Sequence, residues 1–461
     1  MRKTLIRGAT IVTMDHQGDL FDADILIEGS EIKEIATHIN VQADQTIEGK
    51  GYIVIPGLIN AHMHTWQTAL RALASNWTLL EYFQKMHSGL AKVFEPEDLY
   101  IATYMGALNQ INCGTTTLVD WCHNNKTPEH NDAAIKGLQE SGIRAAFFHG
   151  TPKPEPKEGE IPFWERPHPR KELERLVLQY GSHDLITIGT AILGPHYSTL
   201  DVALHDFMMA KELNIIASMH QGGGSARTPE GWEVLESKGL LGPSINIVHG
   251  HALSDEKLKR FCDLGMTFSA TAESEMSQGH GHPLTGRLRD FGKSPSLGVD
   301  LESVCGGEMF IQARIALGIQ RSLDNFSYRE QHGTIPPTST ITTREALRWI
   351  TIEGARVIGQ LDRVGTLRAG KQADLVMIRS SDLNMQPVND PVSAVIMQTS
   401  LANIENVMIA GEWKKKNGQL VDVQLAPQIE RLNVSAKKIT QALGLSKERS
   451  EEHTSELQSP M

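Results

Sequence analysis

Eight short apolar runs, most of them separated by helical stretches, are the feature that most restricts how this chain can fold. They lie at residues 56–64, 114–121, 143–150, 185–192, 215–220, 245–250, 266–270 and 296–300. Each run has the length and composition of a buried strand, and most are followed by a segment long enough for a crossover helix. Strands that alternate with helices predict a parallel sheet. Eight such units predict an α/β fold of the (β/α)₈ TIM-barrel type.

Histidines and other polar or aromatic residues recur at or just beyond the carboxyl ends of these runs. The first run carries His62 and His64, whose side chains would share one face of a strand because they are two residues apart. Later runs end near Trp121, His149, His220, His249 and Asp300. Catalytic groups of such barrels come from this rim. A random scatter of 19 histidines would not select strand ends so often, so we predict a functional site there.

Strand-like alternation also occurs at both ends of the chain. Residues 1–55 alternate apolar and polar residues between turns rich in Gly and Asp, and residues 361–425 return to that pattern. We therefore predict one small β-sandwich domain built from 1–55 and 361–425, beside a barrel at 56–360. Residues 426–448 predict a C-terminal helix. The polar residues 449–461 are expected to be disordered or an artefact of sequence assembly.

Composition limits the classes of binding partner and the cellular compartment that we expect. The chain has 461 residues and a formal net charge of −11, without a basic cluster or an apolar run long enough to cross a bilayer. We expect no nucleic-acid or membrane partner, a small-molecule substrate and a homo-oligomer. The four cysteines are scattered and form no C-x-x-C pair, which favours reduced thiols in the cytoplasm.

Several motifs resemble those of the amidohydrolase superfamily. Residues 56–64 are similar to its first-strand signature, and residues 365–375 are similar to its closing β-domain signature. Between them, Gly194-Pro195-His196-Tyr197-Ser198, His220, His249 and Asp300 follow in the order that this family uses. The resemblance covers roughly residues 1–425. It is nearest to the mononuclear-metal chlorohydrolases and aminohydrolases related to cytosine deaminase, and it is specific for architecture but not for substrate.

The resemblance implies that His62, His64, His220 and Asp300 hold one divalent metal ion. Three imidazoles and one carboxylate suit a catalytic zinc site that keeps a position for water. Zinc is the expected ion, with iron, manganese or cobalt as alternatives. Such a metal lowers the pKa of bound water to about 7. Asp300 would take the water's proton, and His249 would orient the water or polarise the electrophile. The fourth run lacks the lysine of two-metal relatives, so one metal is expected.

One position departs from the family pattern. Deaminases of this branch carry a glutamate three residues after the fifth-strand histidine, where it passes a proton to a ring nitrogen, but this chain has Gly223. Glu273, just after the seventh run, is the candidate replacement for that acid. Glu275 and Glu308 are interpreted as solvated loop carboxylates. The departure favours an amide, urea or carbamate substrate, whose oxyanion can develop on the metal itself.

The substrate pocket should be built by side chains that follow the first four strands. The predicted substrate-binding residues are Gln67, Trp66, Trp121, His123 and His196. The long, proline-rich segment 151–170 predicts a lid, from which Trp164 could close on the ligand. His280 and His282 form a second H-x-H on a Gly-rich loop, where substrate contact or loop packing is expected rather than a second metal.

The first hypothesis is therefore a metal-dependent hydrolase in which activated water attacks a C–N bond of a small molecule, other than a peptide bond. Deamination or dechlorination of a heteroaromatic ring, with Glu273 as the acid, is an alternative. A degenerate barrel that only binds ligands is a third, and the intact set of four metal ligands argues against it.

Overall fold

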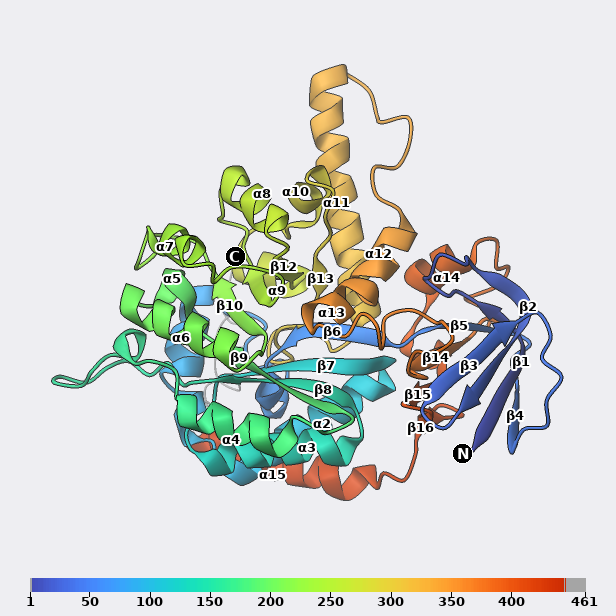
Figure 1. The fold of residues 1–461 in the computed structure, drawn as a ribbon, viewed down its shortest axis with the longest axis horizontal. Helices are drawn as coiled ribbons and strands as arrows, with labels where there is room; N and C mark the ends of the chain where they lie inside the picture. The colour runs from blue at the N-terminus through green and yellow to red at the C-terminus, as the bar shows by residue number, and fades with distance from the viewer. Residues whose placement is uncertain (1, 443, 445–461) are drawn as a thin grey trace, which may run out of the picture.

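The structure is a computed structural model in which residues 2–442 and 444 are described. It contains two sheets that lie side by side (Figure 1). The predicted tail at 449–461 and the end of the predicted C-terminal helix lie outside the described residues. The predicted architecture, a (β/α)₈ barrel beside a smaller β unit made from both chain ends, is confirmed.

The barrel sheet has eight parallel strands in sequence order. They are β6 (Leu58–Met63), β7 (Thr115–Cys122), β8 (Arg144–Gly150), β9 (Ile186–Ala191), β10 (Ala217–Gln221), β11 (Ile245–His249), β12 (Thr267–Ala270) and β13 (Ser296–Leu297). Nearly all of their residues are buried, as expected for strands covered on both faces. The ends of the sheet meet where Asp300 N donates to His62 O at 2.9 Å and His64 N donates to Asp300 O at 2.8 Å. This closure already joins three of the predicted site residues.

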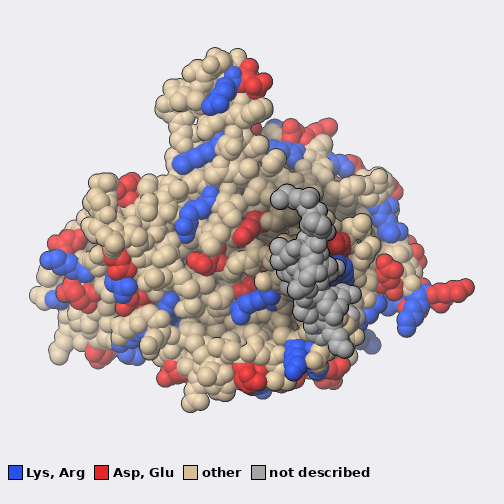
Figure 2. Space-filling view, turned by 180° about the vertical axis from the view of Figure 1, so that it is seen from behind, with Lys and Arg blue, Asp and Glu red and all other residues tan. Residues whose placement is uncertain are grey.

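Helices follow most of the strands and cover the outside of the barrel (Figure 1). The longer ones are α2 (Pro96–Asn112), α3 (Pro128–Ser141), α4 (Arg170–Tyr180), α6 (Leu200–Glu212), α7 (Gly231–Ser237), α8 (Asp255–Asp263), α9 (Ala272–Gln278), α11 (Met309–His332), α12 (Thr343–Trp349), α14 (Pro391–Gln398) and α15 (Leu425–Ala442). Shorter turns are α1 (Leu79–Tyr82), α5 (Gly194–Tyr197), α10 (Thr285–Asp290) and α13 (Ile352–Val357). Helix α11 projects from the body, and acidic and basic side chains both lie at its tip (Figure 2).

The second sheet has nine strands of mixed direction. It contains β1 (Lys3–Ile11), β2 (Leu20–Glu28), β3 (Glu31–Ala36), β4 (Gln45–Glu48), β5 (Tyr52–Pro56), β14 (Leu375–Arg379), β15 (Ile404–Ile409), β16 (Glu412–Lys416) and β17 (Gln419–Leu420). The two chain ends join where β5 pairs antiparallel with β14 in an unbroken register from Tyr52–Arg379 to Pro56–Leu375. Because β5 runs into β6 across Gly57, this pairing fixes the entry of the first barrel strand. The domain boundaries themselves stay a prediction.

The junction between the sheets contains a buried ion pair at the amino end of β8. Arg144 donates to both carboxylate oxygens of Asp374 at 2.7 and 3.0 Å, to Asp184 O at 3.1 Å and to Gln372 Oε1 at 3.2 Å. Asp374 also accepts from the Ala410 amide at 2.7 Å. This network satisfies a pair of buried charges at the end of the barrel opposite the predicted site.

Within the described residues, every helix is too short or too polar to cross a bilayer. Helix α15 instead packs on α2, where Ser435 Oγ donates to Asp98 Oδ1 at 2.7 Å and Lys438 pairs with the same carboxylate.

Candidate active site

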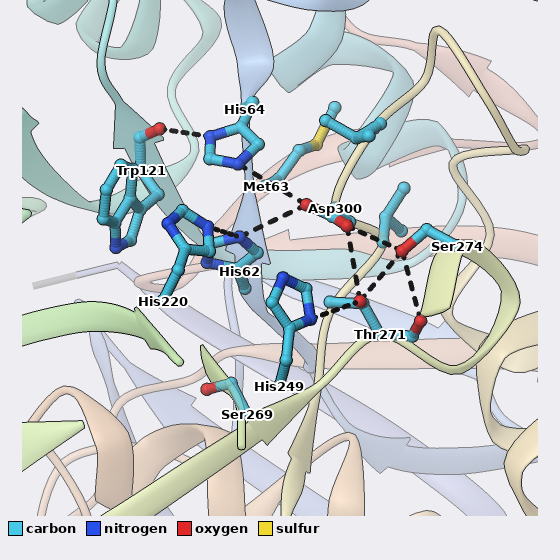
Figure 3. A network of polar contacts seen from close by, with 12 residues as sticks. His62, Met63, His64, Trp121, His220, His249, Ser269, Thr271, Ser274 and Asp300 are labelled. Carbon is cyan, nitrogen blue, oxygen red and sulfur yellow. Dashed lines mark hydrogen bonds and ion pairs between the residues drawn. The ribbon is translucent and has the colours of Figure 1, made fainter. Parts of the chain in front are cut away.

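Three imidazoles converge inside the carboxyl end of the barrel (Figure 3). His62 and His64 lie on β6 and His220 lies on β10, and one ring nitrogen from each falls within a group whose members are all within 4.8 Å of one another. The Nε2 atoms of His62 and His220 are 3.2 Å apart. His62 and His64 share a face of β6 because they are two residues apart. Barrel closure brings β10 opposite them.

The surroundings keep His64 and His220 neutral. His64 Nδ1 donates to Trp121 O at 2.6 Å, so its Nε2 lone pair faces the other histidines. Burial, together with the neighbouring His62, holds the pKa of His64 well below its usual range. Burial also lowers the pKa of His220, with a further contribution from the Lys153 ammonium. Neutral imidazole is the form that binds a metal.

Asp300 completes the cluster from the loop that follows β13. Its Oδ1 lies 3.3 Å from His62 Nε2 and 3.5 Å from His64 Nε2, while its Oδ2 accepts from Ser274 Oγ at 2.6 Å. Burial alone would raise the pKa of Asp300, but the neighbouring imidazoles hold it below its usual range. Its φ of +68° is strained for a non-glycine residue and is held by the barrel-closing hydrogen bonds. Asp300 is therefore a fixed carboxylate.

The spacing of these donors fits a small divalent cation. Tetrahedral ligands that lie about 2.1 Å from a zinc ion are separated by about 3.4 Å. The donor separations of 3.2, 3.3 and 3.5 Å match that value. His62, His64, His220 and Asp300 could thus hold one metal ion, as three nitrogen donors and one oxygen donor.

A second pair of titratable groups lies beside the cluster. His249, at the end of β11, directs Nδ1 toward Glu275 Oε1 at 3.0 Å, and the same oxygen accepts from the Thr271 amide at 3.0 Å. Burial raises the pKa of Glu275 to about 7 and lowers that of His249 to about 4. Because Nδ1 faces a carboxylate oxygen, it carries the proton, which leaves Nε2 of His249 as a base at the cavity.

An open cavity of about 370 Å³ extends from this cluster to the surface. His64, His220, His249 and Asp300 form its floor. One side is apolar and comes from the region of α1, through Leu79, Leu80 and Phe83. A floor of imidazoles and one carboxylate under an apolar wall suits a small organic ligand with one polar reacting group.

Comparison with known proteins decides the family. A profile of the family described as "Amidohydrolase family" matches residues 53–414, which covers the whole barrel together with β14 and β15 of the second sheet. The chain belongs to the amidohydrolase family. The predicted resemblance is confirmed, and so is the prediction of a hydrolase acting on C–N bonds other than peptide bonds.

Relatives of this amidohydrolase are similar over most of their length. It is 25% identical to a 5-methylthioadenosine/S-adenosylhomocysteine deaminase from Caldicellulosiruptor saccharolyticus, over 95% of this chain and 99% of the relative. It is 28% identical to an 8-oxoguanine deaminase from Pseudomonas aeruginosa, over 84% and 87%. An atrazine chlorohydrolase from Arthrobacter aurescens TC1, solved with zinc, shares the fold with a TM-score of 0.83, 23% identity and coverage of 94% and 100%.

The structure places only one of the five predicted substrate-binding residues on the cavity wall of the amidohydrolase. His123 lines the cavity and stacks on His64 with ring centroids 4.1 Å apart. The other four lie behind the wall. Trp66 donates to His123, Gln67 donates to Tyr82 Oη at 2.6 Å, Trp121 packs on His220, and His196 contacts Gln221 at 3.0 Å. Three of them, Trp66, Gln67 and Trp121, contact residues of the cavity wall from behind. Strand-end side chains take such positions because the loops that follow cover them.

The predicted acid Glu273 does not face the cavity. Residues 272–278 form helix α9, in which positions two apart point in different directions. Glu273 therefore turns to α11, where it accepts from Gln312 Nε2 at 2.9 Å. Glu275 is 1% exposed and contacts His249, so its interpretation as a solvated loop carboxylate was wrong. The sequence did contain a signal for the position of Glu275. Thr271, four residues earlier, marks the start of a helix, and a helix would direct Glu275 differently from Glu273.

The predicted lid segment does reach the cavity, but through other residues than expected. Lys153, Glu155 and Phe163 line the wall. Trp164 instead packs under the Arg227 guanidinium, 4.1 Å from its ring centroid. His149 also turns away and contacts His168 at 2.8 Å. His280 lines the cavity and stands 4.6 Å from the His249 ring, whereas His282 is exposed.

Proposed function

We propose that this amidohydrolase hydrolyses an amide-, urea- or carbamate-like C–N bond of a small molecule, with one zinc or similar divalent ion held by His62, His64, His220 and Asp300. When bound, the ion would act as a Lewis acid toward the carbonyl oxygen and lower the pKa of water. The spacing of the four donors supports the metal assignment.

The carboxylates around the cavity support the choice of bond. Among the described residues that line it, only Asp300 and the exposed Glu155 carry a carboxylate. Attack on a heteroaromatic ring needs an acid that faces a ring nitrogen. The β10 rim instead offers Gly223, and Glu273 turns to Gln312. A carbonyl substrate does not need that acid, because its developing oxyanion can be neutralised by the metal.

The protein's own groups then move the proton. His249 Nε2 faces the cavity and accepts a proton from the attacking water, while Glu275 stabilises the imidazolium through Nδ1. The same nitrogen returns the proton to the departing amine, which would otherwise leave as a poor anion. Ser274 and Thr271 hold Asp300 in place through Oδ2.

Ring deamination or dechlorination is the second candidate, because the characterised relatives are deaminases and a chlorohydrolase. A panel of aryl amides, ureas and carbamates should be compared with aminated and chlorinated heterocycles, scoring amine, ammonia and chloride release. We expect turnover among the carbonyl compounds. Turnover confined to the heterocycles would reject the first candidate.

One substitution separates the two candidates further. A Cβ at Gly223 would meet only His251 Nε2, at 3.6 Å, so Gly223→Glu should be accommodated. If the wild-type enzyme does not turn over heterocycles, the Gly223→Glu variant should gain that activity. The neighbouring Gly222 is the control, because its Cβ would lie 2.3 Å from Tyr197 Oη and Gly222→Ala should damage the site without adding a reaction.

A further inference from the structure

One cation on the cavity wall has no anionic partner among the described residues. Lys153 lies in the sequence Pro152-Lys153-Pro154 at the start of the lid segment, and its side chain is partly buried. In the part of the chain that the structure describes, its ammonium makes no ion pair or hydrogen bond. Burial lowers the pKa of Lys153 to about 8, and no carboxylate of the described residues pairs with it. A partly buried charge without an anionic partner is unfavourable until an anion reaches it.

The position of this ammonium places it beside the reacting centre. Lys153 Nζ lies 5.3 Å from the ring centroid of Trp121 and 5.7 Å from that of Tyr197. Trp121 in turn packs on the metal-ligand candidate His220, with ring centroids 4.2 Å apart. Two aromatic faces hold a cation in place without neutralising it. Lys153 is thus fixed next to the catalytic cluster while its charge stays available.

The remaining walls add a second requirement. Leu79, Leu80 and Phe83 form an apolar side of the same cavity. The carboxylate nearest to Lys153 in sequence, Glu155, lies at the exposed edge and does not pair with it. A ligand that matches both features has an apolar part and a separate anionic group.

We propose that Lys153 binds an anionic oxygen group, such as a carboxylate, of the substrate, so that the enzyme acts on acidic amides, ureas or carbamates that also carry an apolar part. This inference rests on the proposed function for the scissile bond and adds the class of substrate. Phe163, from the same segment, lines the cavity too. The lid segment therefore carries the recognition.

The test uses the zinc-loaded enzyme and a panel of aryl amides and ureas, each prepared as a carboxylate and as its neutral carboxamide, with linkers of different length. Binding is measured by calorimetry and turnover by product release. The wild-type enzyme should prefer the carboxylate member in at least one pair. Lys153→Met should weaken its binding about 10- to 100-fold and leave the carboxamide within about twofold. Lys153→Arg should retain most of the preference.

The matched control is Lys157→Met, because Lys157 lies on the same segment and is exposed; it should bind like the wild type. No carboxylate preference in any wild-type pair would overturn the proposal, and so would equal losses for both members in Lys153→Met. Failure of the proposed function looks different: no carbonyl compound would be turned over, whereas the binding preference and its dependence on Lys153 would persist.

Discussion

The buried polar groups at the two ends of the barrel differ in whether they have hydrogen-bond partners, and strand β8 runs from one end to the other. At its amino end, Arg144 has partners on Asp374, Gln372 and Asp184. At the carboxyl end, several buried polar atoms have no partner among the described residues, including His62 Nδ1, Glu275 Oε2 and both ring nitrogens of His280. A satisfied network stabilises the fold, whereas an unsatisfied one is available for a ligand or a metal. The comparison therefore distinguishes residues that stabilise the fold from residues that bind a ligand or take part in the reaction.

His220→Ala should have the largest effect at the rim. Losing one ligand nitrogen should reduce kcat/KM by about 1000-fold or more, since a Lewis acid supplies several kcal/mol to the transition state. Thermal unfolding of the metal-free proteins should change far less than activity, because the substitution loses the packing of His220 on Trp121 but also removes a buried polar group. Full turnover in His220→Ala would refute the site.

Arg144→Met should show the reverse pattern. Leaving Asp374 buried without its cation should lower the free energy of unfolding by about 3 to 5 kcal/mol. The activity of each folded molecule should stay within about twofold. Chemical denaturation and active-site-normalised assays measure the two quantities. Adding Asp374→Leu should recover part of the stability, and a variant as stable as the wild type would show that the pair does not secure the junction.

Glu275→Gln tests whether the charge on Glu275 acts through His249. The amide can still contact Nδ1 but cannot stabilise an imidazolium, so kcat should fall about 10- to 100-fold. The ionisation near pH 7 that Glu275 contributes to the pH profile of kcat should disappear, and the metal content should not change. Glu273→Gln is the matched control on the same helix and should leave both kcat and the profile unaltered. An unshifted profile in Glu275→Gln would make the contact merely structural.

The smallest effect concerns acid stability. Burial lowers the pKa of His149 to about 4 and that of His87 to about 3. These imidazoles stay neutral when folded but take up a proton when unfolded below about pH 6.5, so stability is present above that pH and is lost as pH falls toward 4. Chelator-treated protein should melt at lower temperature at pH 5 than at pH 7.5. His149→Gln should shrink that difference by about 2 to 4 °C, and an unchanged difference would contradict the assignment.

The sequence predicted the parts of the site that strand geometry determines. His62, His64, His220, His249 and Asp300 lie at strand ends, where the barrel fixes direction. Side chains on the following loops were not predictable in the same way, because their direction depends on local helix phase. Helix α9 turns Glu275 toward His249 and Glu273 toward α11, neither of which was predicted. The role of Lys153 was not predicted, because the proline-rich segment has no periodicity from which the direction of that side chain could be inferred.

The most direct test of the account is metal analysis of the purified, unstripped protein together with two variants. We expect about one equivalent of tightly bound divalent metal, zinc first, in the wild type. Arg144→Met should contain the same amount, and His220→Ala should lose most of the metal. Less than about a third of an equivalent in the wild type, or an undiminished content in His220→Ala, would contradict the assignment of the rim as a catalytic metal site.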